Sequence, residues 1–199
     1  MPKAVFLAAA CAGLFLAIGG ARADETAPGW AAFEAQIADA KQTMMADPKA
    51  ALEKARKADA LARAKPDSAQ RREAVATSLW LEGEALTRVN KIDEAHAAID
   101  KALKLAAADG KTTRLDADLA LSQARLADAS GDIGLALKSY QRTYDIFARL
   151  NIPRYQSIAL LGLGSIYQKA HDFDRAIGYY RRASKIYSDE PMFQLSAAN

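Results

Sequence analysis

The side chains that could do acid–base or metal chemistry are few and scattered. His96 and His171 lie 75 positions apart, and neither an H-E-x-x-H spacing nor a Cys/His cluster accompanies them. The carboxylate pairs Asp116/Asp118 and Asp172/Asp174 could act as acid and base, but they fall at predicted helix starts, where the helix dipole favours negative charge. No nucleophile-elbow, Walker or dinucleotide-binding glycine motif occurs. These residues therefore predict a chain that is not an enzyme and takes no cofactor or metal.

The charged and aromatic residues give a similarly weak signal for nucleic acid. The net charge of +3 on 199 residues is too small for a typical nucleic-acid binder. The densest basic run, Arg181-Arg182-x-x-Lys185, spreads around a helix and favours a solvated face over an anion site. Tyrosines at 140, 144, 167, 179, 180 and 187 could make a stacking platform, although core packing would account for three of them, Tyr140, Tyr167 and Tyr180.

Composition and repetition define the elements that would carry these residues. The chain has 46 alanines and only three valines, a balance that favours helices and excludes a mostly β protein. In three segments a small residue precedes an alanine by 12 positions: Gly83/Ala95, Ala124/Ala136 and Gly164/Ala176. Successive segments are offset by 41 and 40 residues. Small residues let antiparallel helices approach closely, so this spacing predicts stacked helical hairpins.

The last segment carries a recognisable motif. Leu160-x-x-Leu163-Gly164-x-x-Tyr167 is followed by Ala176-x-x-x-Tyr180 and Ala183, which resembles the tetratricopeptide repeat (TPR). The resemblance implies an all-α, TPR-like solenoid of antiparallel hairpins with a period of about 40 residues. Asp93 and Asp174 are expected N-caps of second helices, and Gly131 is the expected C-cap of a first helix.

The repeating spacing of small residues and the sequence patterns at the two ends divide the chain into six parts. They are a signal peptide (1–23), a degenerate N-terminal capping hairpin (24–66), TPR-like repeats at 76–109 and 117–150, a TPR repeat at 157–190, and the start of an incomplete further helix (191–199). The signal peptide is predicted from Lys3, the apolar run 4–18 and the small-x-small site that ends at Ala23. Cleavage there predicts a periplasmic or otherwise extracytoplasmic protein without a thiol.

The remaining candidate surface is the concave face that first helices line in TPR proteins. The resemblance implies that ligands, typically peptides or proteins, bind there. The residues carried onto that face are Thr77, Trp80, Glu84, Arg88, Asp118, Leu121, Arg125, Asp128, Ile158, Leu161, Gln168 and Lys169. Trp80 is either an aromatic anchor for a ligand or a core residue. The Lys and Asn cluster with which some family members clamp a C-terminal carboxylate is missing, so that activity is not implied.

These patterns predict a non-catalytic protein- or peptide-binding module. The signal sequence, alanine-rich repeats and missing C-terminal cap together resemble the extracytoplasmic TPR sensor regions of bacterial diguanylate cyclases. That resemblance implies a longer membrane signalling protein, with the membrane reached only through a C-terminal segment beyond Asn199. The alternative is a free-standing periplasmic scaffold. Self-association through the uncapped C-terminal end is a further expectation.

Overall fold

Eight α-helices make up almost all of the described part of the chain. The computed structural model describes residues 29–110 and 112–189, so the signal-peptide and final-helix predictions lie outside them. The helices are α1 (Ala31–Thr43), α2 (Pro48–Arg63), α3 (Ala69–Arg88), α4 (Ile92–Ala106), α5 (Arg114–Ser130), α6 (Ile133–Arg149), α7 (Pro153–Lys169) and α8 (Phe173–Asp189). Among these residues there is no strand, so the all-α prediction is confirmed.

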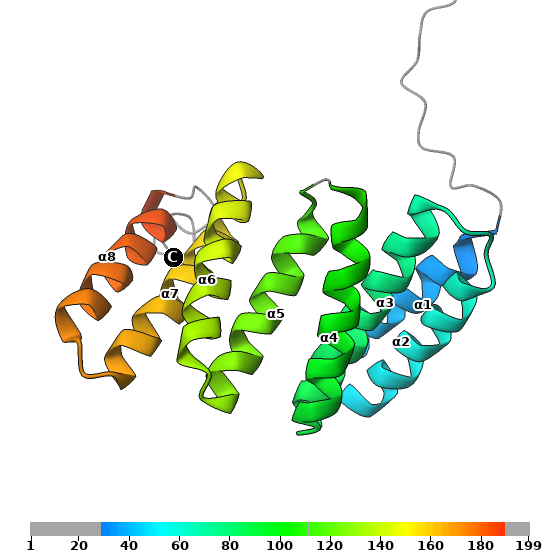
Figure 1. Cartoon of the computed structure of the whole chain (residues 1–199), viewed down its shortest axis with the longest axis horizontal. Helices are drawn as coiled ribbons and strands as arrows, with labels where there is room; N and C mark the ends of the chain where they lie inside the picture. The colour runs from blue at the N-terminus through cyan, green and yellow to red at the C-terminus, as the bar shows by residue number, and fades with distance from the viewer. Residues whose placement is uncertain (1–28, 111, 190–199) are drawn as a thin grey trace, which may run out of the picture.

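Consecutive helices pair as antiparallel hairpins that stack into an elongated solenoid (Figure 1). The first helices α1, α3, α5 and α7 form one layer, and the second helices α2, α4, α6 and α8 form the other. Helix α3 begins at Ala69, seven residues before the expected repeat boundary at 76. The long period is therefore taken up by this longer first helix and by the connection that follows α4, which contains a short 3-10 turn (Ala107–Asp109).

The turns inside three hairpins repeat one backbone geometry. Asn90, Gly131 and His171 each have a positive φ, of 61°, 81° and 59°. The amide of the following residue bonds to the carbonyl oxygen five positions back at 2.9 Å in every case: Lys91 to Leu86, Asp132 to Ala127, and Asp172 to Tyr167. This arrangement closes a helix through a left-handed residue. The prediction that Gly131 ends a first helix is thus confirmed, and His171 is placed as a turn residue.

Two of the expected N-caps were wrong. Asp93 and Asp174 lie inside the first turns of α4 and α8, because those helices begin at Ile92 and Phe173. Asp172 accepts a hydrogen bond from the backbone amide of Arg175 at 3.2 Å, whereas Lys91 precedes α4 without a side-chain cap. Acidic residues in a first turn still interact favourably with the helix dipole, which explains why sequence alone placed both caps two residues late.

The small residues of the repeat lie where the helices of a hairpin come closest. A Cβ atom on Gly83 would lie 2.6 Å from the Ile99 side chain, and one on Gly164 would lie 2.5 Å from the Tyr180 ring. Ala124 occupies the equivalent place in the middle hairpin and is fully buried. The 12-residue spacing therefore marks the contact points between first and second helices, as the sequence predicts.

The core is divided between the two ends of the solenoid, and α5 contributes to both. Leu115, Leu119 and Leu126 of α5 pack with the apolar residues of α1 to α4. Leu121, Ala124 and Ala127 of the same helix pack with α6, α7 and α8. Both flanks of α5 are therefore covered, and only a narrow strip of this helix remains for solvent or ligand.

Candidate binding face

The outward sides of α1, α3, α5 and α7 correspond to the face that is predicted to be concave from the family resemblance. We call it the first-helix face. Its centre is a chain of polar contacts between α3 and α5: the indole N–H of Trp80 donates to the Ser122 hydroxyl at 3.0 Å. Ser122 in turn donates to the Glu84 carboxylate at 2.6 Å, and Arg88 pairs with the same carboxylate at 2.8 Å. These contacts fix the positions of three predicted site residues relative to one another.

A depression of about 250 Å³ opens beside this chain of contacts. It is lined by Glu84, Thr87, Arg88, Ser122 and Arg125, and we call it the Ser122 pocket. Arg125 is exposed and makes no ion pair with any residue that the structure describes. Two guanidinium groups thus face one carboxylate, so the Ser122 pocket carries a net positive charge that favours an anionic group of a ligand.

Trp80 belongs partly to the core and partly to this face. Its ring is half-buried and packs against the apolar cluster of the first two hairpins. The ammonium of Lys41 lies 5.8 Å from the ring centroid, within the range of a cation–π contact. The interpretation of Trp80 as a core residue is therefore partly confirmed, and its role as a ligand anchor stays a prediction.

Asp118 is the ionisable group of this face whose environment changes its pKa. Burial raises the pKa of the Asp118 carboxyl, and the nearby Glu84 carboxylate acts in the same direction. The Arg114 guanidinium, 3.1 Å away, and the Lys41 ammonium oppose that rise without cancelling it. The folded protein therefore binds a proton at Asp118 more readily than the unfolded chain does.

Asp118→Asn is expected to reveal this linkage. Between the raised pKa of Asp118 in the folded protein and its ordinary value of about 3.9, the folded state binds more protons than the unfolded state. Stability therefore falls as pH rises through this range. Relative to the variant, the wild type should therefore gain free energy of unfolding as pH is lowered from about 7 to about 4. Urea unfolding of both proteins at the two pH values measures the difference. A constant difference, or a gain toward neutral pH, would contradict the assignment.

Other predicted residues of the face lie outside the Ser122 pocket. Thr77 lines a separate depression of about 170 Å³ with Trp30, Phe33 and residues of α3. Asp128 and Lys169 form an ion pair at 2.7 Å between α5 and α7, and the Gln168 side chain accepts a hydrogen bond from the Tyr180 hydroxyl at 2.7 Å. Ile158 is half-buried against the second core, whereas Leu161 is 40% exposed.

One predicted residue was wrong and its neighbour was missed. Leu121 is 4% exposed and belongs to the core shared with α6, α7 and α8, so it is unavailable to a ligand. Ser122, the next residue, takes the position at the polar centre of the face. Ser122 is also 4% exposed, so burial does not separate the two residues. What separates them is that the Ser122 hydroxyl joins Trp80 to Glu84, and no sequence pattern marks that contact.

The acidic pairs singled out in the sequence lie at helix starts, and the described residues contain no candidate metal cluster. No group of three or more His, Cys, Asp or Glu side chains within 29–110 and 112–189 is arranged to hold a metal ion. Asp116 forms a capping box with Thr113 at the start of α5, and Asp172 caps α8, which agrees with the helix-start interpretation of both carboxylate pairs. None of the helices in this part of the chain is long and apolar enough to cross a membrane.

Comparison with known proteins agrees with this architecture. The tetratricopeptide repeat family model matches residues 115–189, which span α5 to α8. The crystal structure of BtubC (BKLC) from P. vanneervenii superimposes with a TM-score of 0.65 at 20% sequence identity over 78% of this chain. The chain spans 63% of the length of BtubC, and at this identity the likeness shows the fold alone. No curated protein matches the sequence.

The protein therefore has a TPR-like helical repeat fold. Repeats of this family generally mediate protein–protein interactions and are generally non-catalytic. The match over the last two hairpins supports a TPR-family protein with a protein-binding role.

Proposed function

We propose that this chain binds a peptide or a protein segment through the first-helix face, with the Ser122 pocket as the centre of recognition. The observation that carries the proposal is the arrangement of Arg88 and Arg125 around a depression whose floor is held by the Trp80–Ser122–Glu84 contacts. Pre-positioned side chains reduce the entropy lost on binding. An acidic side chain of the ligand would pair with Arg125, and neighbouring apolar groups would contact the half-buried Trp80.

Arg125→Glu is expected to weaken ligand binding by about tenfold, since it replaces an attractive contact with a repulsive one. The ligand is a peptide selected on the wild-type protein from a random phage-displayed library, and calorimetric titration gives Kd. Trp80→Phe supplies a second test, because it keeps the packing ring and removes the N–H donor to Ser122. That variant should bind more weakly while its thermal midpoint stays close to the wild-type value.

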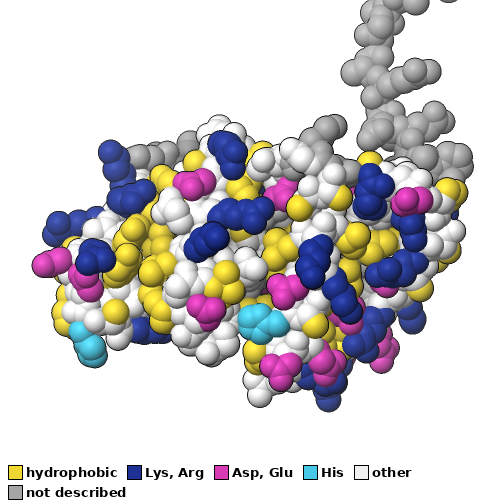
Figure 2. All heavy atoms as spheres, in the orientation of Figure 1, with side chains coloured by type: hydrophobic (Ala, Val, Ile, Leu, Met, Phe, Trp, Pro, Cys, Tyr) yellow, Lys and Arg dark blue, Asp and Glu magenta, His cyan; other side chains and the backbone are white. Residues whose placement is uncertain are grey.

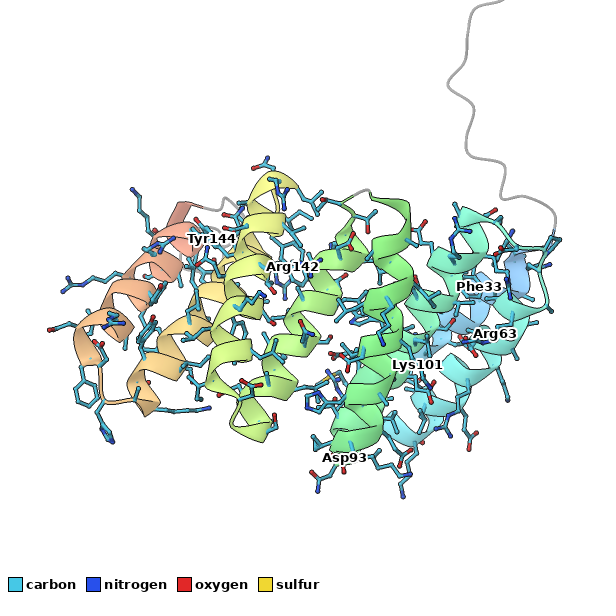
Figure 3. All side chains as sticks on the ribbon, viewed as in Figure 1. Phe33, Arg63, Asp93, Lys101, Arg142 and Tyr144 are labelled. Atoms are coloured by element: carbon cyan, nitrogen blue, oxygen red, sulfur yellow. The ribbon has the colours of Figure 1, made fainter. Side chains whose placement is uncertain are left out.

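Lys101→Glu is the matched control. Lys101 is exposed on α4, in the layer of second helices (Figure 3), and the substitution changes the charge by the same amount. Binding by this variant should stay within about twofold of the wild type, as distant surface charges act weakly. Equal losses from Arg125→Glu and Lys101→Glu would show a general charge effect and remove the Ser122 pocket as the binding site.

We further propose that the module acts outside the cytoplasm as the sensory part of a longer membrane signalling protein. Support comes from the secretion-signal pattern at 1–23 and from the resemblance of the repeats to the sensor regions of diguanylate cyclases. In this arrangement ligand binding would be coupled to a cytoplasmic catalytic domain encoded beyond Asn199. A gene without a downstream membrane helix would contradict the proposal.

A free-standing periplasmic scaffold is the alternative function. The same first-helix face would then bind a component of an assembly, and no membrane segment would be needed. The coding sequence after Asn199 separates the two, since only the sensor requires a membrane helix and a catalytic domain.

A further inference from the structure

Charge is distributed unevenly along the solenoid. Residues 133–189, which contain α6, α7 and α8, have nine basic and four acidic side chains, a net charge of +5. Residues 29–132 have sixteen basic and seventeen acidic side chains. Figure 2 shows Lys and Arg side chains along the whole visible face, with fewer acidic side chains over α6 and α8 than over α2 to α4. The last hairpins therefore carry nearly all the excess positive charge of the described helices.

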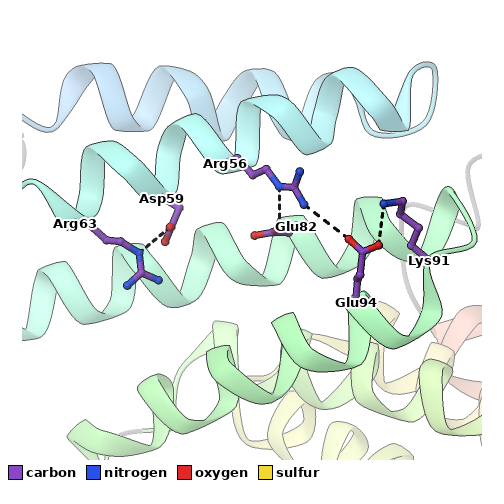
Figure 4. Close-up of polar contacts among 6 residues, drawn as sticks. All are labelled: Arg56, Asp59, Arg63, Glu82, Lys91 and Glu94. Atoms are coloured by element: carbon purple, nitrogen blue, oxygen red, sulfur yellow. Dashed lines mark hydrogen bonds and ion pairs between the residues drawn. The ribbon is translucent and has the colours of Figure 1, made fainter.

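The basic residues of the two regions also differ in their partners. In the first two hairpins, seven of the thirteen cations pair with described carboxylates. Among them, Arg56 pairs with Glu82 at 2.9 Å, Lys91 with Glu94 at 2.7 Å, and Arg63 with Asp59 at 2.7 Å (Figure 4). In 133–189 only Lys169 and Arg175 form ion pairs with residues that the structure describes. Seven cations of this region have no such pair within the described helices: Lys138, Arg142, Arg149, Arg154, Arg181, Arg182 and Lys185.

Arg182 is held in place by aromatic rings. Its guanidinium carbon lies 5.2 Å from the Tyr144 ring centroid and 5.5 Å from that of Tyr179. Figure 3 shows Tyr144 on the side of α6 that faces α8. Tyr179 in turn stacks on Tyr167 at 5.5 Å with an interplanar angle of 9°, so rings from three helices support this cation. Contacts with the guanidinium faces leave its edge N–H groups available to a carboxylate, and none of them bonds to a residue that the structure describes.

We propose that this surface docks an acidic segment of a partner protein, whose Asp or Glu carboxylate pairs with the guanidinium of Arg182. We call it the Arg182 face and define it by Tyr144, Tyr179, Arg181, Arg182 and Lys185. A guanidinium held by rings presents a fork that matches the two oxygens of a carboxylate. Such a fixed fork recognises one group in one position, which suits a protein side chain better than a fluid lipid surface. Residues 29–66 also carry net positive charge, so end-to-end association of two copies is not charge-complementary.

Arg182→Ala tests the proposal. The probe is a fluorescein-labelled peptide of alternating Glu and Ala, and its binding to the full chain is followed by anisotropy. The variant should bind about tenfold more weakly, the size expected for losing one charge-assisted pair. Arg182→Lys keeps the charge and loses the fork, so its affinity should fall between those of the wild type and the alanine variant. Arg182 is exposed, and circular dichroism checks that each variant is folded.

Lys57→Ala is the control, because it removes one exposed cation from α2, far along the solenoid from α8. It should change the affinity by less than about twofold. A matching Gln and Ala peptide should not bind. Equal losses from Arg182→Ala and Lys57→Ala would overturn the proposal, as would binding of the neutral peptide. Arg182-dependent binding to phosphatidylglycerol vesicles without binding to the acidic peptide would assign the surface to a membrane instead.

Discussion

Phe147→Ala is expected to lower the free energy of unfolding by about 3–5 kcal/mol. Phe147 is fully buried on α6, where it packs with Ala117 of α5 and stacks on Tyr155 of α7 at 4.8 Å. Because three helices surround the ring, its loss leaves a cavity that the neighbours cannot easily fill. Urea unfolding followed by circular dichroism gives the free energy of unfolding. An unchanged slope of that free energy against urea concentration would show that the variant exposes the same surface area on unfolding as the wild type.

Phe173→Ala is the matched control for that change. It deletes the same side chain from a residue that is 56% exposed at the start of α8. The expected cost is within about 0.5 kcal/mol, as is usual for surface positions. Similar costs at the two positions would show that Phe147 does not anchor the junction between the last two hairpins.

Gly164→Ala is expected to destabilise the protein by about 1–3 kcal/mol, even though alanine is the better helix former. The new Cβ atom would lie 2.5 Å from the ring of Tyr180, closer than non-bonded carbon atoms approach. The ring cannot swing away freely, since its hydroxyl donates to Gln168 at 2.7 Å. The α7–α8 hairpin would therefore open, and thermal unfolding would record a lower midpoint.

Gly178→Ala should have the opposite sign. Gly178 lies within α8, and a Cβ atom there would meet nothing within 4 Å. The same substitution should stabilise by up to about 1 kcal/mol through helix propensity alone. If both glycine variants stabilise the protein, that result would contradict the close contact between Gly164 of α7 and Tyr180 of α8. Combining Gly164→Ala with Tyr180→Ala should cost less than the sum of the single changes, because the clash is then absent.

The repeat grid was predictable because hairpin packing demands small residues at fixed places. Gly83, Ala124 and Gly164 lie at the closest helix contacts, and the left-handed turn residues Asn90, Gly131 and His171 follow with the same 41- and 40-residue offsets. The repeat boundary was predicted at 76, seven residues after α3 begins at Ala69, although Pro66, Asp67 and Ser68 mark a break just before this helix. Its cap, Ser68, bonds to the amide of Arg71 at 3.1 Å.

The candidate site was predicted with less success, because its residues depend on which side of each helix is covered. Glu84, Arg88 and Arg125 line one pocket, and their binding to a ligand stays a prediction. Leu121 was assigned to that face, but it packs with α6, α7 and α8 because α5 is covered on both flanks. The next residue, Ser122, forms the polar contacts with α3 and was not predicted. Both residues are 4% exposed, so a burial pattern does not show which of the two forms hydrogen bonds between α3 and α5.

The sequence by itself determined the fold class and the hairpin spacing, because alanine content, glycine positions and turn residues act within one or two turns of helix. Only the tertiary structure decided which cations are paired and which are not. Arg56 pairs with Glu82, which lies 26 positions away in the sequence. Arg182 contacts the rings of Tyr144 and Tyr179 and pairs with no carboxylate among the described residues. Ion pairs and ring contacts depend on distances between helices, and a linear pattern does not specify those distances until the hairpins are stacked.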